Sequence, residues 1–120
     1  PEERFSLVGG DAFEYFEALE AEGKLFDVMY AGCSMNEGTD QLRRFLRRLK
    51  PSGAAVFNLG SRRQGMYFVA DGGRICERFM WVNFMMAESP RTPPTREQVP
   101  MEPEELGAWI RREVFAQRPA

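Results

Sequence analysis

The chemistry open to this chain is limited first by a residue that it lacks, because none of its 120 residues is histidine. Without histidine there is no Ser-His or Cys-His nucleophile system, and the commonest side chain that binds transition metals is missing too. Cys33 follows Gly32 at the end of an apolar run, where reactive groups are often displayed, but no obvious cation lies near it to lower its thiol pKa. We therefore expect an unreactive thiol and no metal centre.

The spacing of Cys33 and Cys76 matches neither a disulfide framework nor a CxxC metal pair. Reduced thiols are typical of intracellular proteins. No apolar run approaches the roughly 18 to 20 residues of a membrane-spanning helix, and the opening stretch PEERFSLVGG has no signal-peptide pattern. We therefore expect a soluble protein of the cytoplasm or an organelle matrix, neither secreted nor membrane-bound.

Asp11 is the carboxylate whose position is most informative. It follows Gly9-Gly10 and precedes a run in which Ala12, Phe16 and Leu19 share one helical face, with Glu14 in a capping-box position. Gly23 supplies a helix stop. The pattern predicts a helix that begins with Asp11 as its N-cap.

Three apolar runs have the composition of buried strands covered on both faces, and they span Arg4–Gly9, Leu25–Gly32 and Gly53–Gly60. A second amphipathic helix is predicted from Thr39 to about Lys50, where Pro51 ends it. This alternation predicts an α/β fold with a doubly wound, mainly parallel sheet. Ligands of such sheets bind outside the carboxyl ends of the strands, where Asp11 and the residues after Gly32 would lie.

The order changes in the second half of the chain. Two strand-like runs, Gln64–Ala70 and Arg74–Met86, are joined by an Asp-Gly turn, which predicts an antiparallel hairpin. The residues that follow are rich in proline, and then a short terminal helix is predicted. We therefore divide the chain into an α/β unit (1–88), a proline-rich linker or strap (89–102) and a terminal helix (103–120).

Charge gives no global signal for a polyanion partner, because 16 Lys and Arg residues against 18 Asp and Glu residues leave a net charge of −2. A local basic run is nevertheless present, and it contains Arg43, Arg44, Arg47, Arg48 and Lys50, joined by Arg62 and Arg63. It could form a patch for RNA or an acidic partner, but a solvated helix face is the favoured interpretation and nucleic acid is not expected.

Several segments together resemble one enzyme family. The succession GGD, FDVMYAGCS, LKPSGAAVFNLG, QGMYFVADGG and FMWVNFMM is similar to the protein-L-isoaspartate O-methyltransferases, a family of class I S-adenosylmethionine-dependent methyltransferases. The resemblance covers roughly Phe5 to Ser89. It implies the C-terminal half of a Rossmann-like doubly wound sheet that ends in an antiparallel hairpin.

The resemblance also implies the roles of particular residues. Asp11 would accept a hydrogen bond from the adenine amino group of S-adenosylmethionine, with Ala12, Gly32 and Cys33 around the cofactor. The last strand would lie beside a protein or peptide substrate through Trp81, Val82 and Phe84. The chain departs from the family pattern at five positions, which are Ala12, Tyr30, Asn58, Trp81 and Met86.

The family's glycine-rich loop, its ribose-binding acid and its catalytic hydroxyl residue would all precede Pro1, so we expect an incomplete domain. No catalytic residue is expected within the chain, and residues 1–120 alone are expected to be cofactor-free, which a micromolar complex with S-adenosylmethionine would contradict. The missing N-terminal half or a partner chain would complete the sheet.

Two functions remain open. The first is a carboxyl methyltransferase that acts in protein repair on isoaspartyl residues. The second is an inactive methyltransferase-like module that serves as a structural or interaction subunit of a larger assembly, because fold alone does not fix function. The methionine and aromatic side chains of the hairpin fit either a core or a protein interface.

Overall fold

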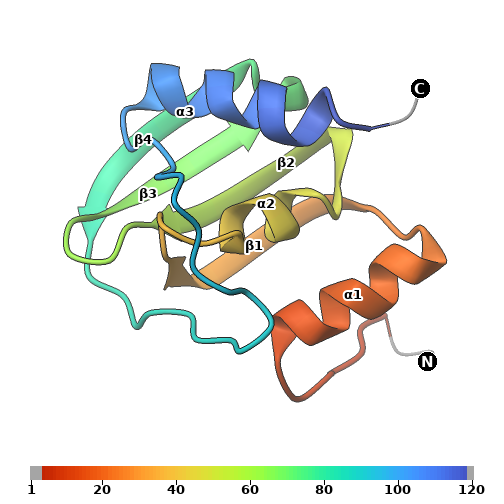
Figure 1. Ribbon diagram of the computed structural model, residues 1–120. Helices are drawn as coiled ribbons and strands as arrows, with labels where there is room; N and C mark the ends of the chain where they lie inside the picture. The colour runs from red at the N-terminus through yellow and green to blue at the C-terminus, as the bar shows by residue number, and fades with distance from the viewer. Residues whose placement is uncertain (1–3, 119–120) are drawn as a thin grey trace.

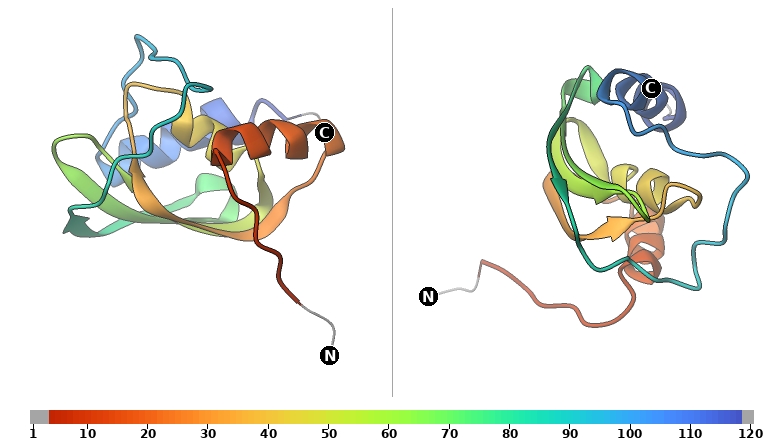
Figure 2. Two further views of the ribbon diagram at one scale, coloured as in Figure 1. Left: turned by 90° about the horizontal axis from the view of Figure 1, so that it is seen from below. Right: turned by 90° about the vertical axis from the view of Figure 1, so that its left-hand side faces the viewer.

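The computed structural model describes residues 4–118 and consists of one open sheet with its helices on one side (Figures 1 and 2). The elements are, in chain order, α1 (Ala12–Glu22), β1 (Phe26–Met35), α2 (Gln41–Leu46), β2 (Leu49–Leu59), β3 (Gln64–Ala70), the 3-10 turn η1 (Asp71–Gly73), β4 (Ile75–Val82), α3 (Pro103–Ile110) and its π-helical continuation η2 (Arg111–Phe115). The predicted outer boundaries at residues 1 and 120 lie outside the described residues.

The strands are arranged in the order β1-β2-β3-β4. β1 and β2 are parallel, whereas β3 is antiparallel to both of its neighbours. The α/β class is confirmed, but the prediction of a mainly parallel sheet is wrong. The connection from β2 to β3 is too short for a crossover helix, so β3 must return antiparallel.

The predicted hairpin is confirmed. β3 has the predicted bounds, and β4 begins at Ile75 but ends at Val82, short of the predicted Met86. The Asp-Gly signal acts as expected, because Asp71 and Gly72 adopt φ angles of 51° and 63° at the turn.

The segment Arg4–Gly9, predicted as the first strand, is an extended coil instead. Its side chains are largely exposed, with Phe5 at 76% and Leu7 at 95% of full exposure. A strand needs a neighbour that takes up its backbone hydrogen bonds, and no backbone pairing joins this segment to the other residues that the structure describes. The apolar pattern alone was not sufficient for a strand.

The first helix follows its sequence signals closely. α1 begins after Asp11, and Gly23 ends it with a left-handed φ of 68°. The buried side consists of Phe13 and Leu19, whereas Ala12, predicted on that face, is exposed. The prediction of the helix is confirmed, and its apolar face is rotated from the predicted one.

The second helix is shorter than predicted. α2 ends at Leu46, and β2 already begins at Leu49, which pairs with Phe26 of β1. This pairing draws the chain into the sheet before Pro51, so the helix does not reach Lys50. Pro51 lies instead in a stretch of β2 where the ladder with β1 shifts register, and a bulge tolerates a residue without an N–H.

The core lies between the sheet and the helices. Phe57 of β2 and Tyr67 of β3 are fully buried in one cluster with Leu42 of α2 and Leu106 of α3. Helices α1, α2 and α3 therefore cover the same face, as Figure 2 shows from two directions.

The opposite face of the sheet has no covering layer among residues 4–118. The strand register places on it Val28, Tyr30, Ala54, Val56, Phe68, Ile75 and Met80, and we call this set the uncovered face. Val28 is 73% exposed and Tyr30 is 64% exposed. The prediction that the run Leu25–Gly32 is covered on both faces is therefore wrong for the residues described.

The chain after β4 returns to the carboxyl end of β1. Ser34 donates its N–H to the carbonyl of Met85 at 2.9 Å and accepts the N–H of Ala87 at 2.8 Å. The proline-rich strap (residues 89–102) then runs past α2, and the N–H groups of Thr95 and Val99 donate to the loop before α2 (Figure 1). The segment is thus held against the domain by backbone hydrogen bonds.

Candidate functional site

An apolar cavity of about 240 Å³ lies at the carboxyl half of β1, between this strand, the first turns of α1 and α2. Its lining consists of Ala12, Phe13, Phe16, Tyr30, Ala31, Gly32, Cys33, Met35 and Phe45. The location agrees with the general rule that open α/β sheets bind ligands outside the carboxyl ends of their strands.

A bulge in β1 shapes this cavity. The ladder pairs Tyr30 with Val56 and then Ser34 with Asn58, so β1 has extra residues between these pairs. The bulge frees the carbonyl of Ala31 from the ladder, and the side-chain amide of Asn58 donates to it at 3.0 Å. The bulge therefore displays Gly32 and Cys33 at the outer edge of the strand.

Three of the four residues predicted to hold the cofactor, Ala12, Gly32 and Cys33, meet in this cavity. Asp11 does not line it. Asp11 lines a neighbouring open hollow of about 350 Å³, together with Gly9, Gly10, Glu14, Tyr15 and Ala18.

The carboxylate of Asp11 is engaged through both oxygens. Oδ1 accepts the N–H of Phe13 at 2.8 Å and that of Glu14 at 3.4 Å, which is the predicted N-cap of α1. Oδ2 accepts the hydroxyl of Ser89 from the strap at 2.6 Å. The Ser89 hydrogen bond, with the two backbone bonds and the nearby charge of Arg91, lowers the pKa of Asp11, so the group is ionised at neutral pH.

The cysteine of the cavity is not activated. Cys33 is partly buried, and this burial raises the pKa of its thiol. Cys76, on β4, is also a free thiol, and burial raises its pKa to about 11. The arrangement agrees with the expected unreactive thiol. Among residues 4–118 no cluster of three or more potential metal ligands is found.

Two buried polar atoms near the ends of β1 and β2 have no hydrogen-bond partner among the residues that the structure describes. They are Oδ1 of Asn58 and Oε2 of Glu37, whose other oxygen accepts the hydroxyl of Ser61 at 2.9 Å. Sequence reasoning gave neither residue a role in a site. The available signals were a polar Asn58 within an otherwise apolar strand, and the place of Glu37 in a loop close to the predicted ligand edge.

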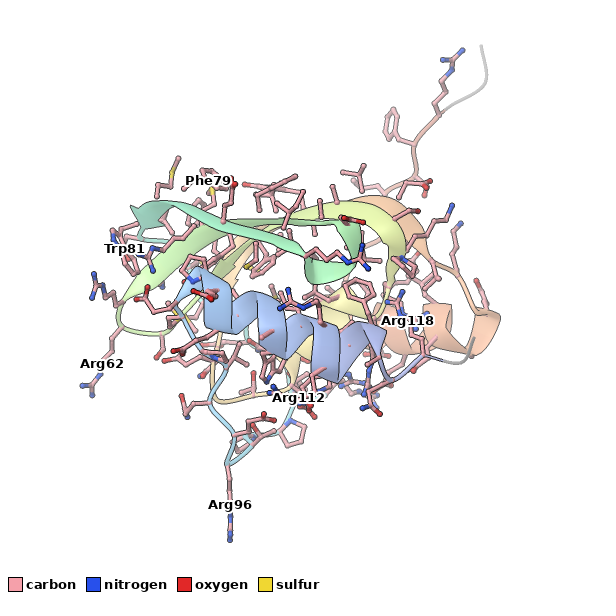
Figure 3. The ribbon with its side chains drawn as sticks, turned by 90° about the horizontal axis from the view of Figure 1, so that it is seen from above. Arg62, Phe79, Trp81, Arg96, Arg112 and Arg118 are labelled. Carbon is pink, nitrogen blue, oxygen red and sulfur yellow. The ribbon has the colours of Figure 1, made fainter. Side chains whose placement is uncertain are left out.

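The residues predicted to contact substrate lie at the other edge of the sheet, on or just after β4. The ring of Trp81 lies between two guanidinium groups, with the central carbon of Arg63 3.9 Å and that of Arg78 4.0 Å from the ring centroid (Figure 3). Val82 pairs with Gln64, whose side-chain amide also bonds both backbone groups of Phe84. None of the three lines the apolar cavity.

The basic run divides between separate environments. Arg43 pairs with Asp40, Glu97 and Glu113, Arg44 pairs with Glu17, and Lys50 pairs with Asp27. These ion pairs neutralise this part of the run, but the Arg43 and Arg44 side chains are only 15% and 20% exposed, so they do not form the solvated helix face that was predicted. Arg47 and Arg48 face a different hollow.

Comparisons with known proteins assign no family to the chain. A scan against models of protein families finds no match, and a search of curated proteins finds none either. In the part of the chain that the structure describes, no helix combines the length and apolar character needed to cross a bilayer.

Proposed function

We propose that this chain supplies the adenine-binding edge of an S-adenosylmethionine-dependent carboxyl methyltransferase, similar to those that repair isoaspartyl residues. The observation that carries the proposal is the convergence of Ala12, Gly32 and Cys33 on one apolar cavity at the carboxyl end of β1.

The residues present fit an adenine ring. Phe13 and Phe16 give the cavity aromatic walls, and a flat heterocycle packs favourably against such rings. The ionised carboxylate of Asp11 lies on the adjoining residue, and Oδ2 has acceptor capacity beyond its bond to Ser89. No group in the cavity lining carries a charge that would hold the remainder of the cofactor.

Methyl transfer to a carboxylate depends on the orientation of the carboxylate relative to the methyl group more than on a strong base. When bound, S-adenosylmethionine supplies an activated methyl group, which a substrate carboxylate oxygen takes up while the S–CH₃ bonding pair returns to sulfur. The chain's contribution would be to fix the adenine and to exclude water, effects that need no histidine.

A second unit is part of this proposal. The uncovered face is largely apolar, although Glu77 opposite Phe68 also lies on it, and parallel strands such as β1 and β2 are normally covered on both sides. The outer edge of β1 carries one isolated bridge, Ser34 with Met86, among the described residues. The N-terminal half of a methyltransferase domain, or a partner chain of that kind, would pair with this edge and cover the face, in an intracellular compartment where Cys33 and Cys76 stay reduced.

Saturation-transfer NMR with S-adenosylmethionine tests the adenine assignment. Binding to the chain by itself is expected in the millimolar range, with stronger transfer to the adenine ring protons than to the methionine part. The Gly32→Leu variant should abolish this transfer because its Cβ would lie 3.4 Å from the ring of Tyr30, which lines the cavity, whereas Ser52→Leu, at an exposed residue of β2 outside the lining, should not. Equal transfer to all ligand protons, or transfer that Gly32→Leu leaves unchanged, contradicts the proposal.

The alternative is a module without catalysis that serves a larger assembly. The bond from Ser89 to Asp11 favours it, because the strap already occupies the carboxylate that the cofactor would use. Absence of adenine contact in the same experiment, in the Ser89→Ala variant as well as the wild type, would support this alternative.

A further inference from the structure

A hollow of about 360 Å³ lies on the helical side of the molecule, away from the cavity at β1. It is lined by residues from α1, from the turn after α2 and from the C-terminal segment, namely Glu20, Arg47, Arg48, Val114, Gln117 and Arg118. Figure 3 shows Arg118 just beyond the last turn of the terminal helix. The consecutive residues Arg47 and Arg48 therefore share one concave surface with Arg118, which is distant in the sequence.

The charges of this hollow are not balanced. Its one carboxylate, Glu20, is 4.0 Å from Arg48, and the Glu20 side chain is 57% exposed. The next carboxylate along α1, Glu17, is already paired with Arg44 and Arg91. Among residues 4–118, the lining thus carries two positive charges in excess.

These cations are also partly withdrawn from water. The side chain of Arg48 is only 9% exposed. Burial, followed by repulsion from Arg48 and Arg47, lowers the pKa of Arg118. Keeping like charges together in a partly buried site costs free energy unless an anion offsets it.

Neutral hydrogen bonds hold two of the three guanidinium groups in place. Arg48 donates to the carbonyl of Lys24 at 3.1 Å. Arg118 donates to the carbonyl of Leu46 at 2.8 Å and to that of Leu49. These bonds fix the positions of the cations without neutralising them, and each guanidinium retains further N–H donors.

Arg47 differs from its neighbours. Its side chain makes no hydrogen bond, ion pair or ring contact with the residues that the structure describes, although it lines the hollow. A guanidinium group whose N–H donors are unused by the described residues, next to two that are held in place, is suited to bind a small anion.

We propose that this hollow binds a phosphate group, with Arg47, Arg48 and Arg118 as its ligands. A tetrahedral oxyanion would accept hydrogen bonds from several guanidinium groups at once and would offset the excess charge. The sequence indicates a basic run that could form one anion-binding patch, although a solvated helix face is the interpretation it favours. In the structure, only Arg47 and Arg48 of this run line the hollow with Arg118.

Calorimetric titration with inorganic phosphate at constant ionic strength is the first test, with chloride as the reference anion. Saturable binding is expected, and Arg47→Gln should weaken it by about tenfold, the loss typical of one charge-assisted hydrogen bond. The Arg47 side chain makes no hydrogen bond or ion pair with residues 4–118, so this variant should keep a thermal midpoint close to that of the wild type. Arg96→Gln should bind phosphate as the wild type does, because Arg96 is not among the residues that line the hollow and its side chain points away from the rest of the molecule in Figure 3.

Titrations with phenyl phosphate and with acetate test which anion the hollow prefers, and whether a bound phosphate group belongs to a phosphate monoester or to the free ion. Tighter binding of phenyl phosphate than of inorganic phosphate indicates a phosphate monoester as the ligand, whereas the reverse indicates the free ion. The absence of saturable phosphate binding, acetate binding as tight as phosphate, or equal weakening by Arg47→Gln and Arg96→Gln would overturn the proposal.

Discussion

At the scale of single residues, Asp11 combines a structural bond and a long-range bond on separate oxygens. Oδ1 caps α1, and Oδ2 holds Ser89, which is 78 residues away in the sequence. A ligand at Asp11 would therefore share Oδ2 with the Ser89 hydroxyl of the strap and would leave the helix cap intact.

Replacing Asp11 by alanine should lower the free energy of unfolding by about 1 to 2 kcal/mol, because it removes an N-cap. Urea denaturation measures the change. Asp27→Ala is the matched control, because Asp27 pairs with Lys50 through a side chain that is 79% exposed and such pairs contribute little. Equal destabilisation by the two substitutions would contradict the role given to Asp11.

The contribution of Asp11 should depend on pH in a defined direction. The Ser89 hydrogen bond, first among several causes, lowers the folded-state pKa below the ordinary value of 3.8. The stabilisation is therefore fully present above pH 3.8 and is lost as the pH falls through the lower, folded-state value. The difference in stability between wild type and Asp11→Ala, measured by urea denaturation across this range, should shrink on acidification. A difference that grows instead would mean that the carboxylate is not stabilised in its ionised form.

At the scale of elements, sequence signals that act within a few residues predicted the structure well. Predictions that depend on contacts between distant segments did not hold. The cap at Asp11 and the stop at Gly23 fix α1, and Asp71-Gly72 fixes the hairpin, because each acts within a few residues. The Arg4–Gly9 segment fails as a strand because its state depends on neighbours that sequence periodicity does not report.

The candidate site likewise has one part that local sequence signals predict and another part that they do not. Proximity of Gly32 and Ala12 to a strand end and a helix start was predictable from local signals. The hydrogen bond between the strap and α1 was not, because no local pattern connects residues so distant in the chain.

Ser89→Ala should loosen the strap. The substitution removes the hydrogen bond to the charged Asp11 and a local, exposed bond from the N–H of Arg91, which predicts a decrease in stability of about 1.5 to 3 kcal/mol at most, reduced by the partial exposure of the site. Amide hydrogen exchange should accelerate in the strap near Ser89 and remain unchanged in β2 and β3. Thr95→Ala, which removes only a local bond to the carbonyl of Glu97, is the control. Equal exchange in the two variants would show that Ser89 does not tether the strap.

Gly60 is required by the turn between β2 and β3. Its φ is 118°, and a Cβ at this position would lie 2.1 Å from the carbonyl oxygen of Arg63. Gly60→Ala should therefore destabilise the fold by more than about 2 kcal/mol, whereas Gly9→Ala, with open space around it, should change stability by less than about 0.5 kcal/mol. Chemical denaturation that finds the two variants equally stable would refute this account of the turn.

At the scale of the whole molecule, the sheet is packed on one side only among residues 4–118. The helices cover Phe57 and Tyr67, whereas Val28 and Tyr30 point to the other side and remain exposed. An apolar surface of this kind marks an interaction site more often than an ordinary solvent-facing sheet.

Substituting Val28 and Tyr30 together by threonine should reduce the binding of a hydrophobic dye such as ANS while changing the free energy of unfolding by less than about 1 kcal/mol, because exposed side chains contribute little burial. Fluorescence and urea denaturation give the two readouts. A large loss of stability with unchanged dye binding would mean that the uncovered face is packed in solution.

The central claim is that the cavity at the carboxyl end of β1 receives the adenine ring of S-adenosylmethionine. Chemical-shift mapping on the ¹⁵N-labelled chain tests it most directly, by titration with this ligand into the millimolar range. The account predicts shifts concentrated at the amides of Ala12, Gly32 and Cys33. Shifts confined to other parts of the molecule, such as the arginine-lined hollow, or none at all would contradict it.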